Sequence, residues 1–250
     1  EIPGVVCCEG GHPVPDEGSF AGTQKALDLV QGLTEQDTVL FLLSGGGSAL
    51  FEKPLIPGEE LQDITRQLLA CGADIVEMNT IRKRLIVEMN TISDILGDPL
   101  DTIRKRLSAV KGGRFAELCA PAQVFSIVLS DILGDPLDMI ASGPAYPDSS
   151  TCAQAQAIVE KYGLDLSPAA QELLRRETPK SLSNVTTQIT GSVRELCAAA
   201  AEECRAMGYE AVILTDQLCC EAREAGSFLA SILRTHAGNG RPVAFLAGGE

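Results

Sequence analysis

The chain has 250 residues, of which 45% are hydrophobic, and its 20 Lys and Arg residues against 34 Asp and Glu residues give a formal net charge of −14. The apolar content excludes a disordered chain, and the acidic excess argues against a broad surface for nucleic acid or anionic membranes. Because the apolar runs are too short to span a bilayer and no secretory signal opens the chain, we expect a cytoplasmic protein with a small-molecule partner.

Apolar runs alternate with helical periods along most of the sequence. The first half predicts strands at Gly4–Cys8 and Thr38–Leu43 and helices at Phe20–Leu33 and Glu59–Gly72. The second half predicts strands at Gln123–Leu129, Val185–Thr190, Tyr209–Thr215 and Pro242–Leu246, and helices at Ala153–Tyr162, Pro168–Glu177, Val193–Met207 and Glu221–Thr235. This order predicts an α/β fold, a doubly wound, mostly parallel sheet with helices on both faces, as in a Rossmann-like three-layer sandwich.

Segments of sequence recur between residues 75 and 138. The recurrences are Ile75–Ile81 as Ile86–Ile92, Thr80–Leu85 as Thr102–Leu107, and Ser93–Asp101 as Ser130–Asp138. They share no single period, so no repeat architecture follows. A genuine insertion is one explanation, but we favour a duplication or misassigned sequence at about residues 86–107, within one domain that spans 1–250. Each copied motif can then occupy a functional position only once.

A run of three glycines between two serines follows the predicted strand Thr38–Leu43. It comprises Ser44, Gly45, Gly46, Gly47 and Ser48. Glycines let successive backbone N–H groups converge, and a helix that starts at Ser48 would add its positive end, so an anion could bind here. The run matches neither the GxxxxGK[ST] nor the GxGxxG pattern, and a tight structural turn is the alternative explanation.

Two further loops carry polar side chains between predicted elements. His12 lies in a proline-stiffened turn ahead of Ser19, a predicted helix cap, and is a ligand contact, a proton shuttle or a hydrogen-bonded structural residue. Lys111 and Arg114 flank Gly112 and Gly113, which predicts either a second anion-binding turn or only the start of a helix. The basic excess over residues 81–114 suits an anionic ligand, although a solvated helix face explains it equally well.

Acidic residues follow the predicted strand Gln123–Leu129. Asp131 at the end of this strand could hold Mg²⁺ or accept a proton from a substrate hydroxyl, and capping of the next turn is the competing explanation. Asp135 and Ser142 come soon after.

Together these loops resemble those of the type-2 glycerate kinases, both in their residues and in their order along the chain. This family has an N-terminal DUF4147-type domain and a C-terminal MOFRL domain, and its members are sometimes described as hydroxypyruvate reductases. The motifs that carry the resemblance are Gly11–Asp16, Leu43–Leu50, the Glu-Met-Asn-Thr-Ile-Arg-Lys block that runs into Leu107–Arg114, Leu129–Asp135 and Ala141–Pro144.

The resemblance implies ATP-dependent phosphorylation of D-glycerate, usually to 2-phosphoglycerate, with Mg²⁺, in a cleft between two α/β domains. It implies that residues 44–48 hold phosphate or the glycerate carboxylate, that Asp131 and Lys111 are catalytic, and that Asp131 and Asp135 serve the metal. The remaining binding residues that it implies are His12, Gly112, Gly113, Arg114, Ser142, and Asn79 with Arg82 or their copies Asn90 with Arg104.

The sequence departs from the family at both ends. It lacks the N-terminal Gly-Lys motif and the C-terminal Gly-Arg-Gly-Gly-Arg-Asn motif, so we expect an incomplete part of the enzyme without the MOFRL domain. A hydroxypyruvate reductase and a non-catalytic anion-binding fragment are the alternatives, although no GxGxxG with a later ribose-binding acid follows a strand. A homodimer is compatible with the sequence.

Overall fold

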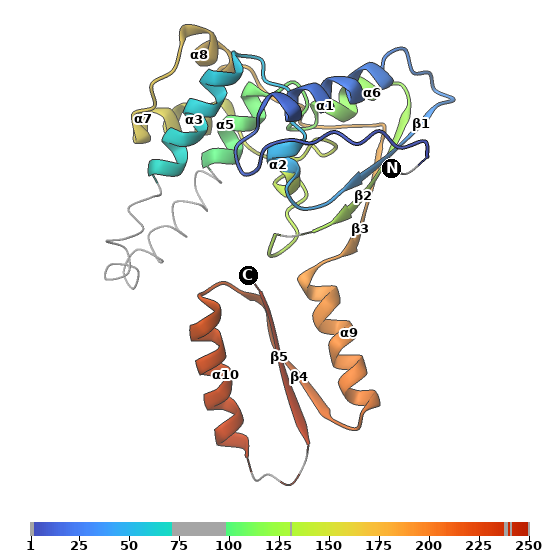
Figure 1. The fold of residues 1–250 in the computed structure, drawn as a ribbon, viewed down its shortest axis with the longest axis vertical. Helices are drawn as coiled ribbons and strands as arrows, with labels where there is room; N and C mark the ends of the chain where they lie inside the picture. Colours follow the sequence, from blue (N-terminus) through green and yellow to red (C-terminus); the bar gives the residue numbers. More distant parts are fainter. Residues whose placement is uncertain (1–2, 72–98, 131, 238–239, 241, 250) are drawn as a thin grey trace. The chain divides into compact units, whose positions relative to one another are not determined.

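A computed structural model describes residues 3–71, 99–130, 132–237, 240 and 242–249 (Figure 1). Helices and parallel strands share the chain, so the predicted α/β class is confirmed. The chain divides into two compact units, residues 1–126 with 137–187 and residues 127–136 with 188–250. The prediction of a single domain over 1–250 stays a prediction.

Three strands form one sheet in the order β1-β2-β3, namely β1 (Thr38–Leu43), β2 (Gln123–Leu129) and β3 (Val185–Gly191). Strands β2 and β3 are parallel, because the amides of Val124 and Ser130 donate to the carbonyl oxygens of Asn184 and Gly191. Side chains alternate between buried and exposed along β2, as expected for a strand with one covered face. Exposed Leu40, Leu42 and Phe125 show that the other face carries apolar residues too.

The covered face of this sheet packs on the helices α1 (Glu17–Leu29) and α6 (Arg114–Cys119). The rings of Phe41, Phe51 and Phe115 meet in this core, with centroids 4.9 to 5.4 Å apart. Offset and tilted ring pairs of this kind stabilise a core beyond the burial of their area. They hold strand β1 in place, and β1 leads into the glycine run.

A second core in the same unit lies among four helices, α3 (Gly58–Cys71), α5 (Pro99–Leu107), α7 (Cys152–Tyr162) and α8 (Pro168–Leu174) (Figure 1). Ile103 and Leu107 of α5 are fully buried within it. The repeated motif Thr102–Leu107 therefore belongs to a buried helix, whereas its copy Thr80–Leu85 lies outside the described residues. The short α2 (Gly47–Leu50) and the 3₁₀ turn η1 (Ile140–Ser142) complete the elements of this unit.

Most predicted elements form within a few residues of the predicted limits, but the strand at Gly4–Cys8 is wrong. This segment runs against α1 instead, where a Cβ built at Gly22 would lie 2.9 Å from Cβ of Cys8. Helix α1 also begins earlier than predicted, because Asp16 rather than Ser19 is its N-cap. The Ser19 amide donates to Oδ1 of Asp16 at 3.0 Å, which satisfies one of the free N–H groups of the first turn.

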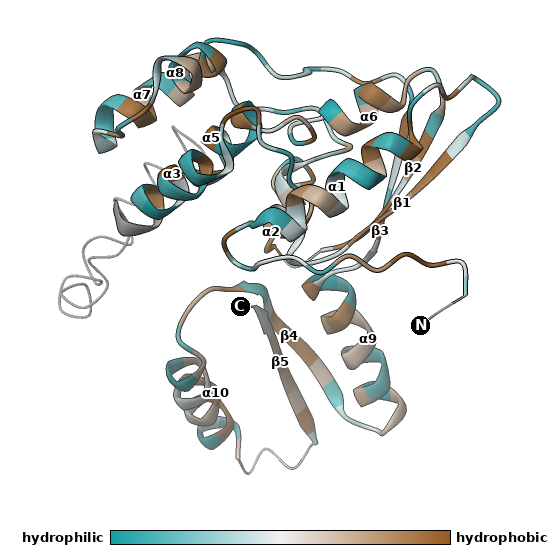
Figure 2. Cartoon of the chain, turned by 45° about the horizontal axis from the view of Figure 1, so that its top comes forward, coloured by the Kyte–Doolittle hydropathy of each residue, from teal (hydrophilic) through white to brown (hydrophobic). Residues whose placement is uncertain are grey.

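The other unit contains a parallel pair of strands, β4 (Glu210–Leu218) and β5 (Val243–Gly249), with the helices α9 (Val193–Ala206) and α10 (Ala222–His236). Both strands are rich in hydrophobic residues, drawn in brown in Figure 2. Helix α9 packs on them so closely that a Cβ at Gly248 would lie 2.6 Å from Cγ1 of Val193. Among the described residues, no helix is both long enough and apolar enough to cross a membrane.

The exchange Gly226→Ala is expected to stabilise α10 by about 0.5–1 kcal/mol, because glycine costs more backbone entropy than alanine in a helix. A Cβ at this exposed position would meet no atom within 4 Å. Urea unfolding followed by circular dichroism measures the difference, with Gly208→Ala, at a φ of 88°, as a control that we expect to destabilise. A loss of stability at Gly226 would contradict the prediction.

Candidate functional site

The glycine run forms the turn between strand β1 and helix α2. Gly46 is the N-cap of α2, and its φ of 82° lies in the left-handed region that favours glycine. No backbone acceptor among the described residues takes the amides of Gly45 and Gly46, and the amides of Gly47 and Ser48 lie in the first helical turn, which has no intrahelical acceptor. This turn therefore offers successive backbone donors, and its use as an anion site stays a prediction.

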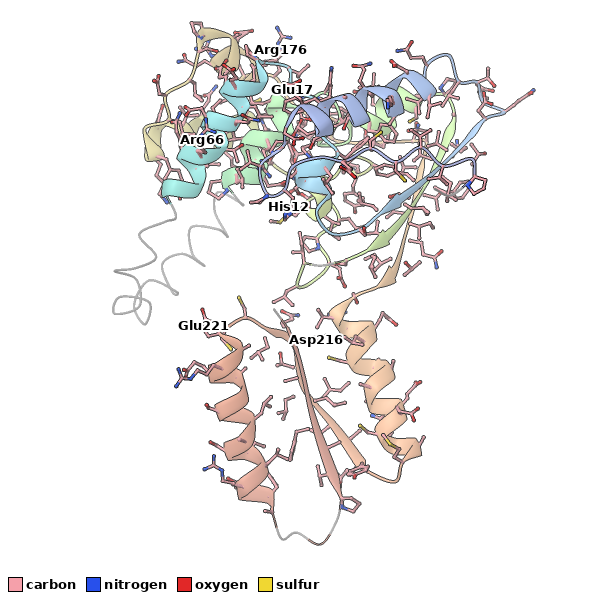
Figure 3. All side chains as sticks on the ribbon, in the orientation of Figure 1. His12, Glu17, Arg66, Arg176, Asp216 and Glu221 are labelled. Atoms are coloured by element: carbon pink, nitrogen blue, oxygen red, sulfur yellow. The ribbon has the colours of Figure 1, made fainter. Side chains whose placement is uncertain are left out.

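His12 lies beside this turn, as Figure 3 shows at the start of α2. A Cβ built at Gly46 would lie 3.7 Å from Cδ2 and 3.9 Å from Nε2 of the His12 ring. The imidazole is exposed. The structure thus brings together two features that are more than 30 residues apart in sequence, the proline-rich turn and the glycine run.

The segment Ala141–Gly143 closes the other side of the glycine run. Ala141, Ser142 and Gly143 have φ values of 51°, 62° and 59°, a left-handed run that is costly for the two non-glycine residues. Two consecutive amides hold it: Gly112 donates to Ser142 at 2.9 Å and Gly113 donates to Gly143 at 2.7 Å. These two glycine amides are therefore engaged within the protein.

Ser142 and Ser48 meet across the two segments. The hydroxyl of Ser142 lies 3.4 Å from that of Ser48, and a Cβ built at Gly47 would lie only 2.6 Å from Cβ of Ala141. Only glycine permits this close approach of the two backbones. The free amides, the two hydroxyls and His12 form one candidate binding site.

Lys111 lies beneath this site and is fully buried. Its Nζ donates to the carbonyl oxygens of Gly47, Phe51 and Ala141 at 3.5, 3.1 and 3.4 Å, and Oε2 of Glu52 lies 3.8 Å away. Burial lowers the pKa of Lys111 and raises that of Glu52, and in each case the charge of the partner opposes the shift. Glu52 was not predicted from the sequence, because a lone carboxylate after a turn carries no signal.

Arg114 and Arg104 are also placed by contacts within the protein. Nη1 of Arg114 donates to the carbonyl oxygens at the end of α5, including that of Lys105 at 3.1 Å, and so caps that helix. Arg104 is buried in α5, near enough to Glu52 and Lys111 for its charge to lower both of their pKa values. Of the pairs Asn79 with Arg82 and Asn90 with Arg104, only Arg104 is among the described residues.

A buried ionic network around Asp148 is the feature that sequence reasoning missed. Lys105 and Arg106, which belong to the basic run on α5, are buried instead of exposed to an anion. Lys105 Nζ lies 2.7 Å from Asp101 and 3.0 Å from Asp148, and Arg106 donates to the Ser150 hydroxyl at 2.8 Å. Burial of three consecutive basic residues gives no periodic signal, because their partners lie up to 71 residues away.

Glu177 at the edge of this network makes the stability dependent on pH. Burial opposes its ionisation, but the Cys152 amide at 2.8 Å and Lys180 at 3.1 Å outweigh that effect and lower the pKa of Glu177 from 4.5 to about 2. Its contribution to the free energy of unfolding is thus present above pH 4.5 and lost as the pH falls towards 2.

The free energies of unfolding of the unaltered chain and of Glu177→Gln, measured in urea from pH 6 to pH 2, should therefore become equal at pH 2. At pH 6 the unaltered chain should be the more stable of the two. The difference should be small, because the Glu177 side chain is 48% exposed and solvent screens its ion pairs. A gap that stays constant with pH would contradict this assignment.

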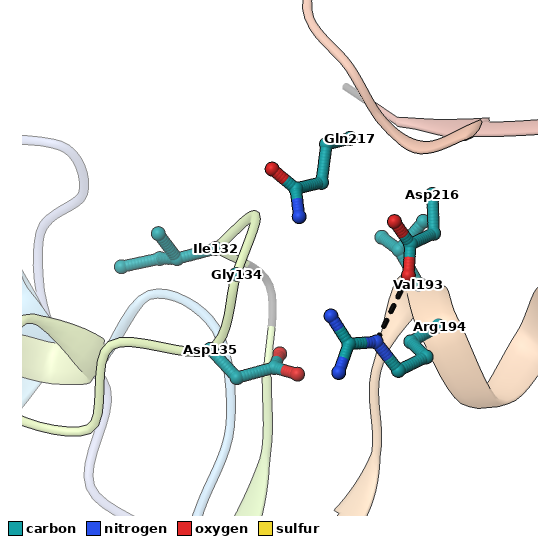
Figure 4. A pocket seen from close by; sticks show the side chains of 7 residues that line it. All are labelled: Ile132, Gly134, Asp135, Val193, Arg194, Asp216 and Gln217. Atoms are coloured by element: carbon teal, nitrogen blue, oxygen red, sulfur yellow. Dashed lines mark hydrogen bonds and ion pairs between the residues drawn. The ribbon is translucent and has the colours of Figure 1, made fainter.

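The unit that contains β4 and β5 has a small polar pocket of its own (Figure 4). Its lining residues are Ile132, Gly134, Asp135, Val193, Arg194, Asp216 and Gln217. Nε of Arg194 donates to Oδ2 of Asp216 at 2.9 Å, a bond that raises the pKa of the guanidinium. The lining residues lie near the carboxyl ends of β2 and β4, strands of two different sheets, and carboxyl ends of strands are where α/β sheets bind ligands.

Of the two predicted metal-binding residues, one is among the described residues. Asp135 lines the pocket just described, whereas Asp131 lies outside the described residues, as do Asn79, Arg82 and Asn90. In the part of the chain that the structure describes, no group of three or more His, Cys, Asp or Glu residues could hold a metal ion. The roles assigned to the individual site residues stay predictions.

The chain is similar to proteins named glycerate kinase and to proteins named putative hydroxypyruvate reductase. It is 48% identical over 248 residues to the D-glycerate 2-kinase of Thermotoga maritima, an alignment that covers 97% of this chain and 54% of that protein. A putative hydroxypyruvate reductase of Agrobacterium vitis is 37% identical over 97% of this chain and 52% of its own length. The crystal structure of glycerate kinase from Thermotoga maritima matches with a TM-score of 0.84 and 45% identity, over 100% of this chain and 56% of that one.

The chain thus spans about half the length of the curated relatives it matches. The family model for a domain of unknown function, DUF4147, matches residues 2–89 and 97–175. The resemblance that the sequence motifs indicated is confirmed by this match and by the glycerate kinase relatives. The chain belongs to the DUF4147 family.

Proposed function

We propose that the protein carrying this chain transfers a phosphoryl group from ATP to D-glycerate, forms 2-phosphoglycerate and requires Mg²⁺. The observation that carries this proposal is the 48% identity, over almost the whole chain, to a D-glycerate 2-kinase. The chain itself would supply part of the enzyme, since it spans about half of that relative. A cytoplasmic location and a homodimer belong to the same proposal.

The candidate site offers donors of the kind that this reaction uses. Phosphoryl transfer depends on positioned donors that neutralise oxygen charge more than on covalent chemistry. The free amides of residues 45–48 and the hydroxyls of Ser48 and Ser142 would bind the glycerate carboxylate or a phosphate, and His12 would contact the same ligand.

Magnesium fits the acidic residues of the chain. This ion keeps several waters and takes one or two carboxylates together with substrate phosphates, so it needs no cluster of three protein ligands. Asp135, at an intermediate exposure in a polar pocket, would provide one carboxylate, and Asp131 would provide the other or accept the proton of the substrate hydroxyl. The ion would neutralise charge on the transferred phosphoryl group.

A coupled assay tests the proposal. The full-length protein and the 250-residue chain are each incubated with ATP, Mg²⁺ and D-glycerate, and ³¹P NMR identifies which hydroxyl is phosphorylated. We expect 2-phosphoglycerate from the full-length protein, with L-glycerate and EDTA as negative controls. Oxidation of NADH by hydroxypyruvate without use of ATP would identify a reductase instead, and binding of D-glycerate without turnover would identify a non-catalytic protein.

A further inference from the structure

Lys111 joins two segments that carry the hydroxyls of the candidate site. Its Nζ donates to Gly47 and Phe51, at the two ends of helix α2, and to Ala141 in the left-handed segment. An ammonium group has three N–H donors, and three carbonyl oxygens surround this one. Because the side chain is 0% exposed, Lys111 presents no surface to the candidate site.

Glu52 pairs with this lysine and connects it to helix α1. Its carboxylate is also 0% exposed and lies 3.8 Å from Nζ of Lys111. Neither oxygen has a well-formed hydrogen bond among the described residues, although burial, which raises the pKa of Glu52, is opposed by the nearby Ser108 hydroxyl and Lys53 amide. The backbone amide of Glu52 donates to Oγ1 of Thr23 in α1 at 2.9 Å. A buried carboxylate this poorly solvated is costly, and the charge of Lys111, with a smaller contribution from Arg104, compensates it.

The geometry of the two hydroxyls depends on the same contacts. Ser48 lies on α2 and Ser142 on the left-handed segment, and their oxygens are 3.4 Å apart. The left-handed run at Ala141 and Ser142 is strained, so it needs outside contacts to persist. The Lys111 side chain and the amides of Gly112 and Gly113 supply these contacts to residues 141, 142 and 143 in turn.

We propose that Glu52 and Lys111 are positioning residues, a buried pair that sets the distance between the Ser48 and Ser142 loops and so shapes the site that binds D-glycerate. The proposal rests on the proposed function in one respect, the identity of the ligand. It assigns a role to Glu52 and makes Lys111 act through the loops instead of on the reacting atoms.

The first test compares two buried lysines in the full-length protein. Lys111→Met should raise KM for D-glycerate about tenfold with kcat nearly unchanged, because the loops bind ground state and transition state alike. Lys105→Met is the matched control, since Lys105 is 2% exposed but contacts Asp101, Asp138 and Asp148 instead of the loops. It should lower Tm and leave KM unchanged. A large fall in kcat for Lys111→Met with an unchanged KM would overturn the proposal.

A double exchange separates positioning from simple stabilisation. Glu52→Leu alone leaves a buried cation without its counter-charge, so it should lower Tm and raise KM. Adding Lys111→Met removes that cation and should restore much of Tm, whereas KM should stay raised because the side chain that bonds to both loops is absent. If KM returned to the value of the unaltered protein together with Tm, the pair would only stabilise the fold and the proposal would fail.

Hydrogen–deuterium exchange tests the pair without any ligand. Lys111→Met should increase exchange at residues 44–51 and 140–143, and Lys105→Met should not increase it there. Unchanged exchange in both segments would refute the positioning role even in an active kinase. An unaltered protein that does not phosphorylate D-glycerate would refute the proposed function alone, since the exchange result stands by itself.

Discussion

The exchange Asp148→Ala is expected to lower the free energy of unfolding by about 3–5 kcal/mol, since it removes one partner from a buried ionic network. The Asp148 side chain is 0% exposed and accepts hydrogen bonds from Lys105 at 3.0 Å, Thr178 at 2.6 Å and the Ser150 amide at 2.9 Å. Without it, the Thr178 hydroxyl and the amide and hydroxyl of Ser150 lose their acceptor, and Arg106, 3.6 Å away, loses a counter-charge. Because a native domain is stable by only about 5–15 kcal/mol, this loss is a large share of the total.

Urea unfolding at pH 7, followed by circular dichroism, measures this effect. The control is Asp63→Ala, which removes an exposed carboxylate 3.6 Å from Arg66 and should change stability by less than about 0.5 kcal/mol. A loss at Asp148 no larger than that of the control would mean that water or a rearranged partner replaces the carboxylate.

The elements of the fold could be predicted because their signals are local. Strand β2 has the predicted limits, Gln123–Leu129, and helix α9 ends one residue before the predicted Met207. Alternation in strands and the 3.6-residue period in helices depend only on neighbours in sequence. Gly4–Cys8 has the same apolar composition as a strand but lies along α1, since a strand also needs a partner that composition does not specify.

The candidate site could be predicted only in part, because its loops have local sequence signals but its contacts join residues that are far apart in sequence. The glycine run, His12 and Ser142 were identified as loop residues, and the structure brings them together. The burial of Lys111 could not be predicted, because its partners Gly47 and Ala141 lie 64 and 30 residues away. A Lys-Gly-Gly-Arg run has the same sequence whether its cations face a ligand or cap a helix.

The exchange Gly47→Ala is expected to lower kcat/KM for D-glycerate phosphorylation by about 100-fold, the size of effect that a displacement of about 1 Å can have in an active site. The added Cβ would lie 2.6 Å from Cβ of Ala141, whereas carbon atoms in contact prefer about 3.5–4.0 Å. Neither carbon can rotate away, so the two loops must separate. Ser48 and Ser142 would then no longer lie 3.4 Å apart.

Steady-state kinetics of the full-length protein measure this loss, and Tm shows whether the variant still folds. Gly226→Ala is the matched control, since it adds the same methyl group where no atom lies within 4 Å and should leave kcat/KM unchanged. The exchange Gly112→Ala tests the turn that holds Ser142, because its Cβ would lie 3.1 Å from Cγ2 of Thr178 and alanine would have to adopt a φ of 59°. If Gly47→Ala kept the activity of the control, the close approach of the two loops would have no part in binding, and the anion would have to bind elsewhere on the glycine run.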